Sequence, residues 1–289
     1  MARKISSNFL KEIKELTKKP ILEYVKYDDT LDMELRGNSV IIYYRGGKLL
    51  TIEENSNVLV GIDEKYYKEG STQILPTIQN IEDYIPQAKH IIDRYVVEKR
   101  NHLWEKEIQQ RIVQENNYSQ NSFDTDFFII DVEYQDIGRA DIVALRWDST
   151  PTAHGLSKNY CPKITLFEIK QGFNTLRGGS GMYPHWKNFN SFISTSDINN
   201  FKQDMIAVFE QKRKLGLIVD MEKCRQINKV ADDIDFIFLL ANYKPSSESL
   251  ANELALLPDN CEFIYANPMG YGLYAKNIVD KQKFIAHFL

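Results

Sequence analysis

Excess charge of one sign, long apolar runs and paired cysteines are all scarce in this sequence. The 289 residues carry 36 basic and 40 acidic side chains, for a formal net charge of −4. This near balance excludes a chain that binds nucleic acid through an overall polycationic surface, so any such surface must be local. The longest strongly apolar run, Phe236 to Ala241, is far short of the roughly 20 residues of a membrane-spanning helix.

The cysteines and the amino-terminal segment favour the cytosol. Cys161, Cys224 and Cys261 share no metal-ligand spacing and cannot all pair, which favours reduced thiols with a structural role. The first 20 residues are basic and amphipathic, but they lack a continuous apolar stretch, and Glu12 and Glu15 argue against a transit peptide. We therefore expect a soluble, cytoplasmic protein.

The amino-terminal part of the chain predicts a small α+β module over residues 1–80, of unknown function. Apolar residues at helical spacing predict a leading helix over residues 7–18 that ends at Pro20. Short apolar segments separated by Gly-containing turns then predict an antiparallel meander with strands over residues 21–27, 31–35, 40–44 and 49–53. Tyr43 and Tyr44 could form a stacking surface, but packing against cross-strand neighbours is the simpler interpretation.

Residues 81–289 predict a second, α/β domain. A long helical stretch over 81–116, interrupted near Pro86, carries a core-facing stripe that includes Ile108, Ile112 and Val113, with Glu105 on the same side. The period then changes to two, which predicts strands over 127–134, 139–147 and 163–170. Further downstream we expect a short helix around 186–193, helices over 198–215 and 247–257, a buried strand over 235–243, and a closing pair of strands over 261–266 and 272–276.

Two segments carry the chemistry that is hardest to explain by packing alone. They are GRADIVAL, residues 138–145, and ITLFEIKQG, residues 164–172. Period two places Glu168 and Lys170 on one face of an otherwise apolar strand. A charged pair in so apolar a run needs water, a partner or a metal, because burying it alone costs several kcal/mol. A plain surface ion pair is the alternative interpretation, and it would contribute little to stability.

These residues give the chain a resemblance to the PD-(D/E)XK superfamily of restriction-endonuclease-like nucleases. Asp141 in GRADIVAL matches the superfamily's first acidic residue, and Glu168 with Lys170 in FEIKQG matches its Glu-x-Lys. The order helix, three strands, helix, strand from about residue 103 to 243 is also similar. The resemblance covers about half the chain and implies a mixed central sheet flanked by helices. The chain departs from the pattern at Ala140, where proline is usual, and in a longer gap between the two acids.

The resemblance also implies roles for single residues. Asp141, Glu168 and the Ile169 main-chain carbonyl would bind Mg²⁺ or Mn²⁺, because hard oxygen ligands suit these ions. Lys170 would orient or deprotonate the attacking water, or stabilise the charge that develops on the phosphate. Glu105 matches the superfamily's common helical carboxylate, and Gln171 could hydrogen-bond substrate or water.

The segment NTLRGGSGMYPH, residues 174–185, is the next candidate for substrate binding. Gly178, Gly179 and Gly181 could leave backbone N–H groups free for an anion, and Arg177 with Lys187 could neutralise a phosphate. A flexible loop is the simpler explanation. His185 could act as a general acid or contact substrate, although a capping or packing role is commoner for a lone histidine.

The sequence therefore predicts a Mg²⁺-dependent nuclease, with DNA favoured over RNA as the substrate. An inactive nuclease-fold module that binds nucleic acid or another protein is the alternative, since a fold by itself does not imply activity. A hydrolase of another small phosphate ester is a third interpretation. No membrane partner is expected, and a homodimer would suit double-strand cleavage.

Overall fold

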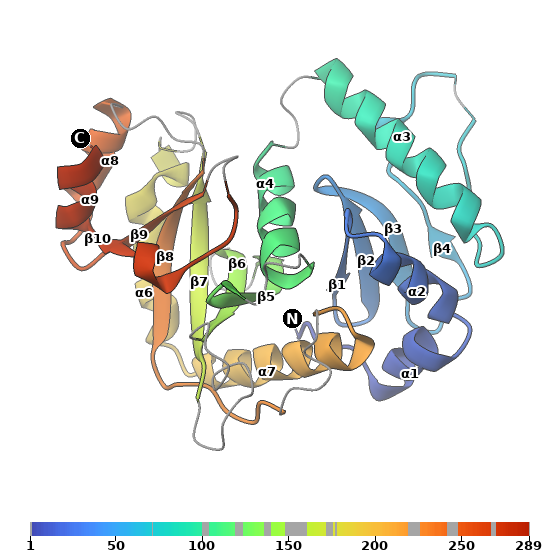
Figure 1. The fold of residues 1–289 in the computed structure, drawn as a ribbon, viewed down its shortest axis with the longest axis horizontal. Coiled ribbons are helices and arrows are strands. Elements are labelled where there is room, and N and C mark those ends of the chain that lie inside the picture. Colours follow the sequence, from blue (N-terminus) through green and yellow to red (C-terminus); the bar gives the residue numbers. More distant parts are fainter. Residues whose placement is uncertain are drawn as a thin grey trace. The chain divides into compact units, whose positions relative to one another are not determined.

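In a computed structural model, the chain forms a mixed α/β fold with two sheets and, among the described residues, eight α-helices (Figure 1). The structure describes residues 2–70, 72–99, 104–118, 124–135, 140–147, 161–171, 176, 178–218, 226–241, 248–266 and 270–288. Contacts divide the chain into two compact units, the first comprising residues 1–114 with 207–222 and the second 115–206 with 223–289. The domain boundary expected after residue 80 stays a prediction. No helix in the described ranges is both long enough and apolar enough to span a bilayer.

Two short helices, α1 (Ser7–Glu15) and α2 (Lys19–Tyr27), begin the first unit. The first confirms the predicted leading helix, and Ser6 caps it by accepting a hydrogen bond from the Phe9 N–H at 3.1 Å. The strand predicted over residues 21–27 is wrong. Pro20 lies in the first turn of α2, where its missing N–H costs nothing and its fixed φ suits a helix, so it begins a helix as well as ending one. The buried side chains of α2 are Ile21, Leu22 and Val25.

The meander itself is confirmed for three of its strands. β1 (Leu31–Leu35), β2 (Ser39–Tyr44) and β3 (Gly47–Glu53) pair in order and antiparallel, and β4 (Leu59–Val60) adds an edge strand that the sequence analysis missed. Arg45 and Gly46 connect β2 to β3 with φ values of 49° and 76°. Positive φ at both central residues is the geometry that lets a two-residue turn follow the twist of a hairpin. A short 3-10 turn, η1 (Glu64–Tyr66), leads out of the sheet.

The predicted long helical stretch is present as two helices, α3 (Ile81–Lys99) and α4 (Trp104–Val113), with a π-helical turn, η2 (Gln114–Tyr118), after the second. The interruption predicted near Pro86 is wrong, because α3 continues through that residue. Burial of Tyr84, Ile85 and Ala88 around it provides packing that offsets the hydrogen bond lost at proline. Ile108 and Ile112 are buried, as the apolar stripe predicts, and residues 100–103 lie outside the described part.

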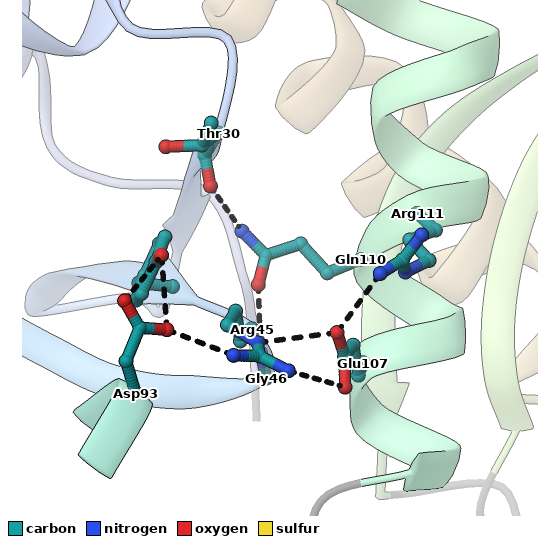
Figure 2. A network of polar contacts seen from close by, with 8 residues as sticks. Thr30, Arg45, Gly46, Asp93, Glu107, Gln110 and Arg111 are labelled. Carbon is teal, nitrogen blue, oxygen red and sulfur yellow. Dashed lines mark hydrogen bonds and ion pairs between the residues drawn. The ribbon is translucent and has the colours of Figure 1, made fainter. Parts of the chain in front are cut away.

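A polar network joins α3 and α4 to the β2–β3 turn (Figure 2). The Gln110 side chain accepts a hydrogen bond from the Gly46 N–H at 2.6 Å and donates to the carbonyls of Thr30 at 2.8 Å and Tyr43 at 3.1 Å. Arg45 bridges Asp93 and Glu107, the latter also held by Arg111. A cavity of about 460 Å³ borders this network. Its lining comprises Thr30, Tyr44, Arg45, Glu107, Gln110, Arg111 and Gln114.

Gln110→Ala should destabilise the protein by about 2–4 kcal/mol, because it leaves three backbone groups without their acceptor or donors. Arg111→Ala on the same helix is the matched control and should cost less than about 1 kcal/mol, since that ion pair is exposed. Urea unfolding of both variants measures the difference. Equal midpoints for the two would show that the Gln110 bonds do not hold this unit together.

The second unit is built on a six-stranded mixed sheet of order β10-β9-β8-β7-β6-β5 (Figure 1). Its antiparallel half is β5 (Phe127–Tyr134), β6 (Ala140–Arg146) and β7 (Lys163–Lys170), all three predicted. β8 (Ile234–Ala241) runs parallel to β7, and β9 (Glu262–Ala266) runs parallel to β8. The short β10 (Val279–Asp280) closes the edge antiparallel to β9. Membership of the restriction-endonuclease-like core stays a prediction.

The predicted downstream helices are α6 (Met182–Ile193), α7 (Ile198–Leu215) and α8 (Glu248–Leu256), followed by an unpredicted α9 (Lys281–Phe288). α7 ends at Gly216, whose φ of 71° suits a helix stop, and its residues from Ala207 onward belong to the first unit. One apolar core covers the sheet face that carries Phe238, Leu240 and Phe263. Its helical members include Met182 of α6 and Leu250 and Leu254 of α8.

The strand predicted over residues 272–276 is wrong, and the partner of β9 is β10 instead. The Leu273 N–H donates to the Asn116 side chain, and the Leu273 carbonyl accepts from the Asp126 N–H, each at 2.9 Å. The Ala275 N–H donates to the Asp126 carboxylate. These bonds satisfy the backbone outside a sheet ladder, and a short 3-10 turn, η7 (Ala275–Asn277), follows.

The described cysteines, Cys161 and Cys261, are free thiols, and Cys224 lies outside the described residues. Cys261 is buried in the apolar core of the second unit. Burial raises the pKa of its thiol to about 11, while the charge of Lys281 opposes the shift. A structural role, as expected from the sequence, suits such a thiol.

At pH 8 we expect iodoacetamide to alkylate Cys261 much more slowly than Cys161. A thiol whose pKa is about 11 is ionised to roughly one part in a thousand at that pH, and only the thiolate reacts rapidly. Peptide mass mapping over time measures the two rates. The difference should disappear in urea, and equal rates in the native protein would contradict the burial.

Candidate active site

Asp141, Glu168 and Lys170 lie on one face of the six-stranded sheet. The pairing of Ile142 with Phe167 places Asp141 of β6 opposite Glu168 of β7. Glu168 and Lys170 are in turn in register with Phe238 and Leu240 of β8. Residues in register share a face, so this is the face that the apolar core covers. The alternation predicted for β7 is therefore confirmed.

The Asp141 carboxylate binds the backbone of the neighbouring strand. Its Oδ2 accepts a hydrogen bond from the Ile169 N–H at 2.7 Å, and Asp141 is 4% exposed. The pairing of β6 with β7 runs from Arg146 to Ile142, so the Asp141 side chain acts as acceptor where the ladder ends. Since the N–H and C=O of a strand residue project to the same edge, the Ile169 carbonyl also faces β6. Its proposed role as a metal ligand stays a prediction.

Lys170 is held at two points. Its Nζ lies 2.8 Å from Glu168 Oε1 and 2.7 Å from the Ser180 carbonyl oxygen, and the side chain is 3% exposed. The ion pair with Glu168 thus exists, but the interpretation as a surface pair is wrong. Removing one partner of such a pair leaves a buried charge, which is far costlier than losing an exposed pair.

The two carboxylate oxygens of Glu168 have different surroundings. Its Oε1 binds Lys170 and lies 2.9 Å from His185 Nδ1, without the alignment of a hydrogen bond. Within the described part of the chain, its buried Oε2 has no hydrogen-bond partner. A buried carboxylate oxygen normally has one, so this position invites a ligand that carries positive charge or a proton.

Glu133 of β5 is a neighbour that the sequence analysis missed. Val132 pairs with Ile142 and Tyr134 with Ala140, which puts Glu133 opposite Asp141. A carboxylate oxygen of Glu133 lies within 4.8 Å of one of Asp141. The sequence does contain a signal, the second acid in the segment Asp131-Val132-Glu133, but the register depends on a one-residue bulge between Ile129 and Asp131.

Glu133 also has an unusual backbone, with φ of 54°. A non-glycine residue in this region carries a conformational cost, and such residues are enriched at functional sites. Three carboxylates thus come from three adjacent strands, Glu133 from β5, Asp141 from β6 and Glu168 from β7.

The other predicted site residues are more scattered. Gln171 directly follows β7 and is partly buried, and Lys187 is exposed on α6. His185 of α6 contacts the site through Glu168, which the sequence did not indicate. Arg177 lies outside the described residues. Glu105 lies on α4 in the first unit, so its accessory role at this site stays a prediction.

Of the three glycines considered for an anion nest, Gly181 does not leave its N–H free for an anion. After the 3-10 turn η5 (Gly178–Ser180), the Gly181 N–H donates to the Gly178 carbonyl at 3.1 Å. The Met182 N–H, in the first turn of α6, donates to Glu253 Oε2 at 2.7 Å. The chain's own carboxylate therefore takes the position at which an anion would bind.

Comparison with protein-family models, with curated proteins and with solved structures finds no match for this chain. The resemblance to the PD-(D/E)XK superfamily therefore remains a prediction from the residues themselves. What the site offers chemically is three carboxylates on adjacent strands, two of which, Glu133 and Asp141, have oxygens within 4.8 Å of each other, and a buried lysine.

Proposed function

We propose that this protein is a divalent-metal-dependent nuclease whose active site is centred on Glu168. The observation that carries the proposal is the buried Oε2 of Glu168, which has no hydrogen-bond partner in the described part of the chain. It lies beside a lysine, with Asp141 opposite on the neighbouring strand. A purely structural ion pair would gain nothing from leaving this oxygen unsatisfied.

The donor set suits a hard cation. Asp141 and Glu168 would hold the ion, Glu133 would supply a third carboxylate, and the Ile169 carbonyl faces the same strand edge. Mg²⁺ and Mn²⁺ prefer such oxygen ligands and keep several waters. When bound, the ion would supply positive charge against a phosphate and make a water nucleophilic near neutral pH.

Lys170 would act beside that position. Among the described residues, two of its three N–H donors have protein acceptors, Glu168 and the Ser180 carbonyl. The third can donate to the attacking water or to a phosphate oxygen, and after losing a proton the same nitrogen could act as the base. The two contacts fix the ammonium in place, which favours a positioned role over a freely rotating charge.

Nucleic acid is the proposed substrate, and the resemblance favours DNA. The composition favours a cytoplasmic location. The net charge of −4 gives no general attraction to polyanions. An inactive scaffold with the same fold is the alternative. It would bind nucleic acid or a protein without using the carboxylates.

We expect Mn²⁺ to bind the wild-type protein and to raise its unfolding midpoint. At a metal concentration about 100 times Kd, the stabilisation should be about 2.7 kcal/mol. Asp141→Asn and Glu168→Gln should abolish it, and Glu133→Gln should weaken affinity roughly tenfold, as changes around a metal site commonly do. Thermal unfolding during a Mn²⁺ titration measures all four proteins.

Asp235→Asn is the matched control, because Asp235 is a carboxylate on β8 that pairs with Arg146 and Lys163. Its Mn²⁺ affinity should equal that of the wild type. Equal stabilisation of all variants would place any metal elsewhere, and no stabilisation of the wild type would argue against the metal site.

Cleavage of DNA and RNA in Mg²⁺ should fall about 10²–10⁴-fold in Lys170→Gln, the usual range for a lost acid–base or charge-stabilising group. Lys163→Ala, at the other end of the same strand, should retain activity, because that lysine pairs with Asp233 and Asp235 instead. Initial rates on both substrates measure the effect.

Folding must be checked in parallel, since Lys170 is buried. If Lys170→Gln unfolds at the wild-type temperature and still cleaves at the wild-type rate, the proposed role of the lysine is wrong. A wild type that binds either nucleic acid without cleaving it favours the scaffold.

A further inference from the structure

Glu253 reaches from α8 to the first turn of α6. Its Oε2 accepts a hydrogen bond from the Met182 N–H at 2.7 Å. The two helices pack through one apolar core, to which Met182, Leu250 and Leu254 belong. A carboxylate at a helix amino terminus is favoured by both the unsatisfied N–H groups and the helix dipole.

The residue before Met182 leaves room for this carboxylate. A Cβ at Gly181 would lie 2.8 Å from Glu253 Oε2 and 3.0 Å from Oε1. The first distance is shorter than real Cβ contacts and the second is tighter than most of them, while the φ of Gly181, −64°, suits any residue. Glycine here permits the close approach of Glu253, and a larger residue would displace the flexible end of that side chain; the backbone conformation itself does not call for glycine.

The contact continues to the site. Ser180 immediately precedes Gly181, and its carbonyl oxygen lies 2.7 Å from Lys170 Nζ. We call the contact of Glu253 with Gly181 and Met182 the clamp. The turn that it holds presents one of the two acceptors of the buried Lys170 ammonium, and Glu168 is the other. Loss of the clamp would release the carbonyl and leave Lys170 held from one side.

We propose that Glu253 is a positioning residue that fixes Lys170 through Met182, Gly181 and the Ser180 carbonyl. Its consequence for catalysis rests on the proposed nuclease function, but its effect on Lys170 does not. Among the described residues, Glu253 forms no hydrogen bond or ion pair with Lys170, Asp141 or Glu168, so it would act on the lysine through the turn.

The first test is acetylation of Lys170 by acetic anhydride in the native protein, followed by peptide mass mapping. Lys170 should be protected in the wild type, and Glu253→Ala should raise its labelling roughly tenfold, the change in opening expected when a charge-assisted hydrogen bond is lost. Glu253→Gln keeps an oxygen acceptor for the Met182 N–H and should stay within about twofold of the wild type. Asn252→Ala, exposed on the same helix, is the matched control, and exposed Lys187 calibrates the reagent.

A double-mutant cycle distinguishes loss of the Glu253 contact from a general destabilisation of the protein. Gly181→Ala should displace the Glu253 carboxylate and raise Lys170 labelling as Glu253→Ala does. The double variant should be no worse than Glu253→Ala, because both changes break the same contact. Additive effects, or unchanged labelling in Glu253→Ala, would overturn the proposal.

Cleavage kinetics then test the catalytic consequence. Glu253→Ala should lower kcat with KM unchanged, and Glu253→Gln should restore kcat, because the lysine acts in the chemical step. Inactive wild-type protein with the expected labelling pattern would overturn the nuclease function and leave the clamp supported. Full activity of Glu253→Ala despite increased labelling would overturn the positioning role.

Discussion

The buried contact between Lys170 and Glu168 is the constraint on which the second unit's chemistry depends. Two opposite charges on one strand face, each almost fully excluded from water, require one another. They also require partners beyond each other, because an ammonium has three donors and a carboxylate has four acceptor positions. The Ser180 carbonyl supplies one such partner, and the Glu168 oxygen that has no partner in the described part of the chain leaves one place for a ligand.

The surrounding strands and helices place further polar groups around this pair. β6 brings Asp141 against the Ile169 backbone, and β5 brings Glu133 against Asp141. On the other side, α6 begins at the turn that faces Lys170 and carries His185 close to Glu168. The carboxylates and the lysine are therefore held by different parts of the fold. The antiparallel strands position the carboxylates, and the turn that Glu253 of α8 contacts holds the lysine from the other side.

The first unit also contains a network of polar contacts, but there the contacts are structural. Gln110 satisfies three backbone groups of the β2–β3 turn and its surroundings, and Arg45 lies between two carboxylates. Here each polar group of the network in Figure 2 has a protein partner, so the arrangement holds helices to a sheet. At Glu168 one oxygen has no such partner among the described residues, and this difference is why the proposed active site lies in the second unit.

The sequence by itself determined the strands β5, β6 and β7, the shared face of Glu168 and Lys170, and the carboxylate at Asp141, because period-two alternation is a local property. It misassigned α2 and the segment at 272–276, because Pro20 can begin a helix as well as end one and because side chains distant in sequence satisfy the backbone near Leu273. Only the tertiary structure decided that Glu133 faces Asp141, since a single bulged residue shifts the register and with it the face of every following side chain. It alone also brought Glu253 of α8 to Gly181, because contact between helices distant in sequence depends on how their apolar faces pack, which no local pattern specifies.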